Sequence, residues 1–410
     1  MAPALNRSAA PRIVSAAMAP KPRICVGMSG GVDSSVTAYL LKQQGYDVIG
    51  LTFRGWPQDC RSLEEDRCCG PQAVMDARMV AHSLGIPHYV IDEIDTFRRE
   101  VMDYFAAEYQ RGRTPNPCII CNERVKFGSL LRKARTLGAE QIATGHYARV
   151  VKTNGLSQAG TPVPPKIEDG GRGVPPVHGH GDERAGRPFH YRLRRARDER
   201  KDQSYFLFSL SQEQLGRAVF PLGELTKEQT RAIAKEIGLK TYGKQESQEV
   251  CFVPENDYRR FLREGAGVGD RSGEIVTRDG RRVGEHAGIH NFTIGQREGL
   301  NIGGLKRPLY VVALDSAANR VIVGTDDELM RDEFQISHCT WSAMAEPSTP
   351  VECTVKIRSN SECVPAAIVT LSLSKGLGRV RLHRPQRAVT PGQAAVFYQD
   401  DLVIGGGWIC

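Results

Sequence analysis

The sequence contains no apolar run of the length needed to cross a bilayer, so it does not support membrane insertion. It also has no apolar segment of the secretory type near its start. Its eleven cysteines in 410 residues therefore indicate reactive or metal-binding thiols in a reducing compartment rather than a disulfide framework. Two common phosphate-binding motifs are absent as well, because neither G-x-G-x-x-G nor a loop ending in G-K-[ST] occurs.

What the sequence does contain is a different Gly-rich turn, GMSGGVDS at residues 27–34. The apolar run 24–28 predicts a buried strand before it, and residues 34–44 predict a helix after it. Gly30 and Gly31 allow backbone N–H groups to approach an anion closely, and the helix N-terminus adds partial positive charge. An ordinary Gly-Ser turn with a Ser or Asp N-cap is the alternative, but the register of strand, turn and helix favours a phosphate-binding loop.

The pattern S-G-G-x-D-S resembles the loop of the ATP pyrophosphatase superfamily. Members of that superfamily split ATP between its α and β phosphates and attach AMP to an oxygen of the substrate. The resemblance implies that Asp33 holds Mg²⁺ and that Ser29, Ser34 and the glycines hold pyrophosphate.

Apolar runs and helical patterns alternate between residues 23 and 150. The expected strands and helices, in chain order, are strand 24–28, helix 34–44, strand 48–53, helix 71–84, strand 88–92, helix 95–110, helix 123–137 and strand 141–144. This alternation predicts an α/β fold with a doubly wound parallel sheet whose ligand lies at the carboxyl ends of the strands. Residues 152–188 are rich in Gly and Pro and predict a flexible insertion. Beyond it we expect a helix at 225–238 with Thr226 as N-cap, and a small antiparallel β-barrel at the C-terminus.

The formal charge of +8 is compatible with a polyanionic partner. The first twenty residues contain Arg7 and Arg12, several Ser and Ala, and no acidic residue, which is the composition of an organelle transit peptide. Met18 could equally be the start of a bacterial cytosolic protein. The expected location is therefore cytoplasmic, with a mitochondrial or plastid location as the alternative.

Cysteine is where we expect the chemistry. A C-x-x-C at Cys118 and Cys121, in the segment RTPNPCIICNERVKFG, stands directly before the helix expected at 123–137. Asn122 or Cys121 could cap this helix, and a thiol at a helix N-terminus has a lowered pKa and is more nucleophilic at neutral pH. Cys251 in ESQEVCFVP is distant in sequence and on its own would more often be a core residue.

Taken together, these motifs resemble the tRNA-specific 2-thiouridylase family, which replaces the 2-oxygen of the wobble uridine of certain tRNAs with sulfur. The matching segments run from residue 27 to 399 in the family's order: GMSGGVDSSVTAYLLKQQGYDVIGLTFRGW, RTPNPCIICNERVKFG, ATGHYARV, KDQSYFLFSL, FPLGELTKEQTR, ESQEVCFVP, GEHAGIHNFTIGQREGLNIGG and TPGQAAVFY. Several motifs in one order are a more specific signal than any single motif.

The resemblance implies a role for each matching residue. Those implied to contact ATP are Gly27, Met28, Ser29, Gly30, Gly31, Val32, Asp33, Ser34, Phe53 and Gly145. Those implied to contact the target base or the rest of the tRNA are Asn116, Pro117, Cys118, His146, Lys201, Asp202, Gln203, Arg358, Ser359 and Gln393. A single-stranded anticodon base suits such a pocket, because it is readily extracted from its stack.

The implied catalytic residues are Cys118, Cys121 and Cys251. In the family's common form Cys251 carries sulfur as a persulfide received from a relay protein, such as a cysteine desulfurase system, and Cys121 releases the sulfur by forming a disulfide with Cys251. That form has Asp where this chain has Cys118, and the Asp assists proton transfer. A thiol cannot be assumed to do the work of a carboxylate, so we favour the hypothesis that this chain resembles cluster-dependent tRNA thiolases. In that form the three cysteines hold a [4Fe–4S] cluster whose fourth iron binds sulfide. A structural zinc site would need a fourth protein ligand.

The family resemblance also suggests the limits of the domains. We expect a tail or targeting segment at 1–20, a catalytic domain at 21–254, a central tRNA-contacting domain at 255–325 and a barrel at 326–410. Cys60, Cys68 and Cys69 form a second group of thiols that we leave outside the site.

Two rival functions remain. An amidating ligase with the same loop would have no use for the cysteines, and a non-catalytic RNA-binding or iron–sulfur protein would have no use for the loop.

Overall fold

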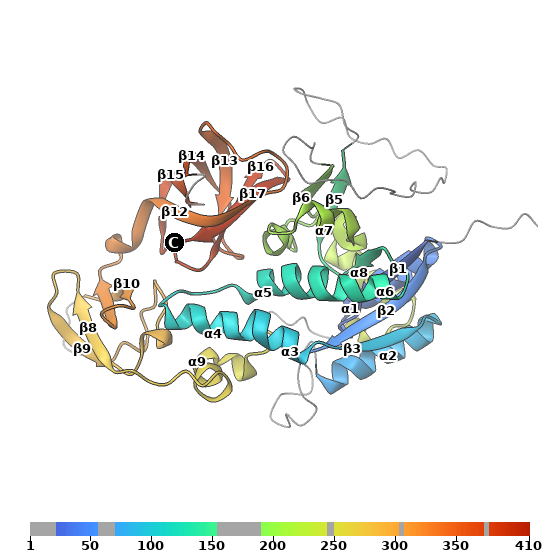
Figure 1. The fold of residues 1–410 in the computed structure, drawn as a ribbon, viewed down its shortest axis with the longest axis horizontal. Coiled ribbons are helices and arrows are strands. Elements are labelled where there is room, and N and C mark those ends of the chain that lie inside the picture. The colour runs from blue at the N-terminus through green and yellow to red at the C-terminus, as the bar shows by residue number, and fades with distance from the viewer. Residues whose placement is uncertain (1–21, 56–69, 154–189, 244–249, 303–306, 373–376) are drawn as a thin grey trace, which may run out of the picture.

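The computed structural model describes residues 22–55, 70–153, 190–243, 250–302, 307–372 and 377–410 (Figure 1). The predictions for the tail at 1–20, for the insertion from residue 154 onward and for Cys60, Cys68 and Cys69 fall outside these residues. Within the described part of the chain, no helix combines the length and the apolar character needed to cross a membrane.

A five-stranded parallel sheet lies at the centre of the first domain, with strand order β3-β2-β1-β4-β7. Its strands are β1 (Arg23–Gly27), β2 (Asp47–Arg54), β3 (His88–Asp92), β4 (Gln141–Ala143) and β7 (Ala218–Val219). In β1, Ile24 and Val26 pack into one hydrophobic cluster and Cys25 into another. Both faces of the sheet are therefore buried, which explains why these strands are continuous apolar runs.

Helices cover the two faces of this sheet. The face of Ile24 and Val26 packs against α1 (Val32–Gln43), α2 (Pro71–Leu84) and α8 (Lys227–Glu236). The opposite face packs against a continuous helical segment formed by α5 (Pro117–Ile120), the π-helical η2 (Cys121–Ser129) and α6 (Leu130–Thr136). This arrangement confirms the doubly wound α/β fold class.

The helix that carries the C-x-x-C begins earlier than the sequence analysis expected. It starts at Pro117 rather than near Glu123, so Cys118 and Cys121 lie within its first turns and do not precede it. Proline is favoured at the first helical position, where its missing N–H has no helical partner to lose. Asn116 is the N-cap, and the Asn122 side chain donates to the Phe206 carbonyl instead of capping.

The helix expected at 95–110 is present from Ile94, although it contains a π-helical stretch. It comprises α3 (Ile94–Phe97), η1 (Arg98–Met102) and α4 (Asp103–Gln110). The helix expected at 225–238 is α8, and the Thr226 side chain caps it by accepting from the backbone N–H of Gln229.

Two further sheets follow along the chain. The strands β8 (Gly273–Thr277), β9 (Arg282–His286), β10 (Tyr310–Asp315) and β11 (Arg320–Gly324) form a small separate sheet. The strands β12 (Met330–Trp341), β13 (Val351–Lys356), β14 (Val364–Ser372), β15 (Leu377–Arg387), β16 (Ala394–Gln399) and β17 (Leu402–Ile409) form an antiparallel barrel. Pairing of β12 with β17 closes the barrel, which confirms the expected C-terminal architecture.

The barrel packs directly against the first domain (Figure 1). A hairpin of β5 (Ala148–Lys152) and β6 (Tyr191–Arg195) extends the barrel sheet, because β6 pairs with β17. Barrel residues such as Val396 and Tyr398 belong to the same hydrophobic cluster as Cys25 of β1. The two domains therefore share one core.

Candidate active site

The Gly-rich turn joins β1 to α1 as the sequence predicts. Gly31 is the N-cap of α1 and has an extended backbone, and no side chain caps the helix. Ser34 Oγ accepts from the Ser29 N–H at 3.2 Å and lies 3.3 Å from Ser29 Oγ. This uncapped helix N-terminus, flanked by two hydroxyls, provides the donors that a phosphate requires.

A cavity of about 180 Å³ opens above this turn at the carboxyl ends of β1, β2 and β4. Seven of the residues implied to bind ATP line this cavity: Gly27, Met28, Ser29, Asp33, Ser34, Phe53 and Gly145. Thr52, Lys126, Thr144, His146 and Gln203 line it as well. The structure thus gathers residues from four separate sequence motifs around one cavity, although Gly30, Gly31 and Val32 are not part of its lining.

Two glycines allow this close packing. Gly30 has a φ of +72°, and a Cβ there would lie 2.4 Å from the Ala73 carbonyl oxygen of α2. A Cβ on Gly145 would lie 2.8 Å from the Ser34 nitrogen and 2.9 Å from the Asp33 carbonyl carbon. The turn after β4 therefore touches the start of α1 in a way that only glycine permits.

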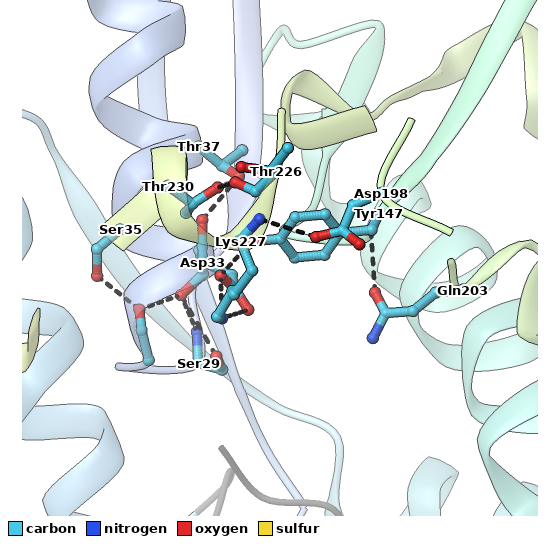
Figure 2. A network of polar contacts seen from close by, with 12 residues as sticks. Ser29, Asp33, Ser35, Thr37, Tyr147, Asp198, Gln203, Thr226, Lys227 and Thr230 are labelled. Atoms are coloured by element: carbon cyan, nitrogen blue, oxygen red, sulfur yellow. Dashed lines mark hydrogen bonds and ion pairs between the residues drawn. The ribbon is translucent and has the colours of Figure 1, made fainter. Parts of the chain in front are cut away.

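Asp33 is held by two residues that the sequence analysis did not assign to the site. Lys227 Nζ lies 2.7 Å from Asp33 Oδ1 and 2.9 Å from Oδ2. The Tyr147 hydroxyl donates to Oδ1 at 2.9 Å. Figure 2 shows the lysine and the tyrosine converging on the carboxylate from α8 and from the strand-end turn.

His146 contributes a neutral imidazole to the cavity wall. Burial, together with the positive charge of Lys126, lowers the pKa of His146 well below its usual value. Its Nδ1 is 2.7 Å from Thr144 Oγ1. The ring therefore offers hydrogen bonding without charge at neutral pH.

Two of the three predicted catalytic cysteines adjoin one hydrophobic cluster. Cys121 is 8 % exposed and belongs to this cluster, and the half-buried Cys251 packs against it. Phe53 packs against the same cluster and also lines the cavity. Cys118 is exposed at the surface, one helical turn before Cys121.

The positions of the predicted ligands decide which of the expected metal groups, a [4Fe–4S] cluster and Mg²⁺, the site could hold. In the described ranges, no three His, Cys, Asp or Glu side chains are arranged to hold a metal ion. The observed arrangement of Cys118, Cys121 and Cys251 therefore does not fit a three-cysteine cluster. Mg²⁺ with ATP commonly needs only one or two carboxylates in addition to phosphate oxygens, so Asp33 fits that role.

The residues implied to contact tRNA fall into two groups. Gln203 and His146 line the cavity, and the Tyr147 backbone N–H donates to Gln203 Oε1 at 3.0 Å. The Asp202 carboxylate instead accepts from the backbone of Ala196 and Ser204 and thus fixes its own turn. Lys201 lies half-buried in the same turn.

The second group lies where the barrel meets the C-x-x-C segment. Gln393 Nε2 donates to the Thr114 carbonyl at 2.9 Å, only a few residues before the buried Asn116 and Pro117. Arg358 donates to the Ala388 carbonyl and to Thr390 Oγ1, and burial together with Arg387 lowers its pKa. Ser359 follows it, half-buried.

Sequence reasoning missed Lys227 and Tyr147, although both lie within motifs that it quoted. Tyr147 belongs to ATGHYARV and Lys227 to FPLGELTKEQTR. The sequence could have pointed to Lys227, because a lysine in the first turn of a helix is unfavourable next to the positive end of the helix dipole. Such a lysine suggests a functional role.

Comparison with known proteins identifies the class to which this fold and site belong. Three family models match consecutive segments: a tRNA methyl transferase HUP domain at residues 22–255, a tRNA methyl transferase PRC-barrel domain at 259–325 and an aminomethyltransferase beta-barrel domain at 331–409. The chain is thus an α/β HUP-domain protein with a C-terminal barrel.

Individual relatives narrow the assignment. A tRNA-specific 2-thiouridylase MnmA of Geobacter metallireducens is 46 % identical over 94 % of this chain and 96 % of its own. The proteins of the same name from Roseiflexus sp. and Clostridium perfringens are 46 % and 42 % identical over 94 % and 95 % of this chain, and 99 % and 98 % of their own. The chain belongs to the tRNA-specific 2-thiouridylase family. A solved 4-thiouridine synthetase bound to RNA and ATP matches only weakly, with 15 % identity, a TM-score of 0.32, and coverage of 59 % of this chain and 50 % of that one.

Proposed function

We propose that this chain is a tRNA-specific 2-thiouridylase that uses ATP to activate the wobble uridine and then transfers sulfur to it. The observation that carries the proposal is the junction at Phe53, which joins the loop-lined cavity to the cluster holding Cys121 and Cys251. An ATP site and a pair of thiols at one junction suit activation followed by sulfur transfer. The description of the family models names methyl transfer, but the paired cysteines and the named relatives favour sulfur transfer.

Activation overcomes the poor leaving ability of the uracil 2-oxygen. That oxygen attacks the α-phosphorus of ATP, the bond from this phosphorus to the bridging oxygen breaks, and pyrophosphate leaves with the electron pair. The helix α1 N-terminus and Ser29 and Ser34 would hold pyrophosphate, and Asp33 would hold the Mg²⁺ that neutralises its charge.

Sulfur transfer then uses the two cysteines. The terminal sulfur of a persulfide on Cys251 attacks C2 of the base, and AMP leaves. The Cys121 thiolate attacks the inner sulfur of Cys251, which leaves the thiolated base and a disulfide between the two cysteines. An external thiol must reduce this disulfide, and a sulfur-donor protein must recharge Cys251 before the next turnover.

The tRNA would contact both the catalytic domain and the barrel. Asn116, Pro117 and Cys118 would surround the target base, and the remaining contacts would come from His146, Lys201, Asp202, Gln203, Arg358, Ser359 and Gln393. We propose the same domain limits as expected from the sequence, with the central domain at 255–325 contacting the tRNA.

A thiolation assay tests the proposal. The purified chain is incubated with tRNA, Mg-ATP and a persulfide donor, and 2-thiouridine is measured by mass spectrometry of digested tRNA. Cys121→Ser and Cys251→Ser should abolish 2-thiouridine, while the surface variant Cys410→Ser should match the wild type. ATP cleavage without 2-thiouridine in the wild type, unchanged in both cysteine variants, would favour an amidating ligase, and tRNA binding without ATP cleavage would favour a binding protein.

The role of Cys118 needs a separate measurement. The iron and acid-labile sulfide of protein purified without oxygen should be negligible if the persulfide route operates. About four of each per chain, lost in Cys118→Ala, would instead establish the cluster route and overturn the persulfide scheme.

A further inference from the structure

Lys227 occupies a position that is electrostatically unfavourable for a lysine. It is the first residue of α8, where the helix dipole presents partial positive charge, and its side chain is only 7 % exposed. Burial also removes most of the hydration of its ammonium group. A lysine at this position must be stabilised by its surroundings.

The stabilisation comes from Asp33 and its neighbours (Figure 2). Both Asp33 oxygens lie within 2.9 Å of Lys227 Nζ, and the Tyr147 ring centroid is 5.6 Å from it. The buried Asp198 accepts from the Lys227 backbone N–H at 3.1 Å and so fixes the start of α8. The ammonium is therefore directed at the residue that the superfamily resemblance assigns to Mg²⁺.

Asp33 does not depend on this ion pair for its own stability. It lies in the first turn of α1, where the helix dipole already favours a carboxylate, and its side chain is 29 % exposed next to the cavity. Tyr147 supplies a further hydrogen bond. The lysine, rather than the aspartate, is the partner whose placement calls for a functional explanation.

We propose that Lys227 is a catalytic cation that moves from Asp33 to the pyrophosphate group when Mg-ATP binds. In the nucleotide-free protein it neutralises Asp33 in place of a metal ion. Asp33 would hold the Mg²⁺ of Mg-ATP, and the flexible side chain of Lys227, released from the carboxylate, would turn its ammonium to the β and γ phosphate oxygens. The inference rests on the proposed function, because it assigns a role within ATP cleavage.

The adenylation step develops negative charge that an ammonium group can stabilise. As the uridine 2-oxygen bonds to the α-phosphorus, the bond to the bridging oxygen breaks and its electron pair remains on pyrophosphate, while the N3 proton of the base passes to solvent. Negative charge thus grows on the leaving group next to α1. An ammonium group that becomes available only once Asp33 has bound the metal stabilises that charge more in the transition state than in the ground state.

Pyrophosphate release provides the first test. Lys227→Met should lower the kcat of tRNA-dependent pyrophosphate release about 100-fold, whereas Lys235→Met, an exposed lysine on the same helix, should have no effect. Lys227→Gln, which can still donate to Asp33, should be equally impaired and serves if the methionine variant is unstable. A folded Lys227 variant with wild-type turnover would overturn the proposal.

Metal binding provides a test that does not depend on turnover. Mn²⁺ added to the nucleotide-free protein should bind roughly tenfold more tightly to Lys227→Met than to the wild type, because the competing cation is gone. Lys235→Met should bind Mn²⁺ like the wild type. Loss of turnover with unchanged Mn²⁺ affinity would make Lys227 a structural residue and overturn the proposal.

Failure of the inference is distinguishable from failure of the proposed function. If the wild-type chain neither cleaves ATP to AMP nor forms 2-thiouridine, the proposed function fails. If the wild type does both and the Lys227 variants behave like it, only the assignment of Lys227 fails.

Discussion

At the scale of single residues, the shape of the cavity above the Gly-rich turn depends on Gly145, which has no side chain. The turn after β4 lies against the first turn of α1, and a Cβ on Gly145 would meet the Ser34 nitrogen at 2.8 Å. The three atoms nearest to that Cβ are the Ser34 nitrogen, the Asp33 carbonyl carbon and Asp33 Cβ, so no flexible side chain can move aside. The conflict would displace the loop itself.

We therefore predict that Gly145→Ala weakens ATP binding at least about tenfold, because the loop donors no longer converge on the phosphates. Isothermal titration with a non-hydrolysable ATP analogue measures the effect. Gly269→Ala, where a Cβ meets nothing within 4 Å, is the matched control. Equal affinity of the two variants would contradict the close contact at Gly145.

His146 gives the fold a dependence on pH. Its pKa is lowered by burial, so the unfolded chain binds a proton at a higher pH than the folded chain does. The contribution to stability is complete above the unfolded pKa of about 6.5 and is lost as the pH falls below it, by up to about 1.4 kcal/mol per pH unit. His146→Gln should flatten this loss between pH 7 and pH 5 in urea unfolding, and an unchanged slope would count against a half-buried neutral imidazole.

At the scale of elements, two of the described helices begin with capping boxes of the same design but in different surroundings. Ser211 and Gln214 cap α7 (Gln212–Arg217), and Thr226 and Gln229 cap α8. Each N-cap hydroxyl accepts a hydrogen bond from the backbone N–H of the glutamine. In return, the backbone N–H of each N-cap residue donates to the side-chain oxygen of that glutamine. Only α8 carries a residue of the candidate site at its first position.

Thr226→Ala and Ser211→Ala should each lower the free energy of unfolding by about 1 kcal/mol. Only Thr226→Ala should also slow pyrophosphate release, because fraying of the first turn of α8 displaces Lys227. Urea unfolding and the pyrophosphate assay, run on both variants, separate the two effects. Equal turnover in the two variants would show that the position of Lys227 does not depend on the cap.

The sequence predicted elements well wherever burial and local chemistry agreed. The strands of the parallel sheet were visible because both of their faces are buried, and Thr226 was visible as an N-cap because capping is a local interaction. The start of the cysteine helix was misplaced because Pro117 was not recognised as the first helical residue, a position that proline favours. The two-residue strand β7 is too short to leave a pattern.

The contacts of the site were harder to predict because they join distant residues. Lys227 and Asp33 are 194 positions apart, and Tyr147 and Asp33 are 114 apart. No spacing rule connects such positions, so the sequence could supply the loop and the cysteines but not the groups that hold Asp33. The family resemblance located most of the cavity lining, and the structure added the ion pair.

At the scale of the whole molecule, the barrel braces the segment that leads into the cysteine helix. The Arg113 side chain donates to the Ile409 carbonyl, the Thr114 N–H donates to the Pro391 carbonyl, and Gln393 donates back to Thr114. Gly392 makes this contact possible, since a Cβ there would lie 2.9 Å from the Thr114 nitrogen and oxygen. The position of Cys118 and Cys121 is thus tied to a domain nearly 280 residues further along the chain.

Gly392→Ala should therefore impair sulfur transfer beyond its effect on stability. Its φ of +89° makes any side chain strained, at a cost of about 1–2 kcal/mol. Gly280→Ala is the matched control, because its φ is +86° but a Cβ there meets nothing within 4 Å. Both variants should lose stability through the backbone strain in urea unfolding, and Gly392→Ala should lose more because of the clash. Only Gly392→Ala should form 2-thiouridine roughly tenfold to a hundredfold more slowly, because the clash moves the cysteine helix relative to the barrel. Equal rates of thiolation in the two variants would mean that the barrel does not position the thiols, and that its contact with Thr114 serves stability alone.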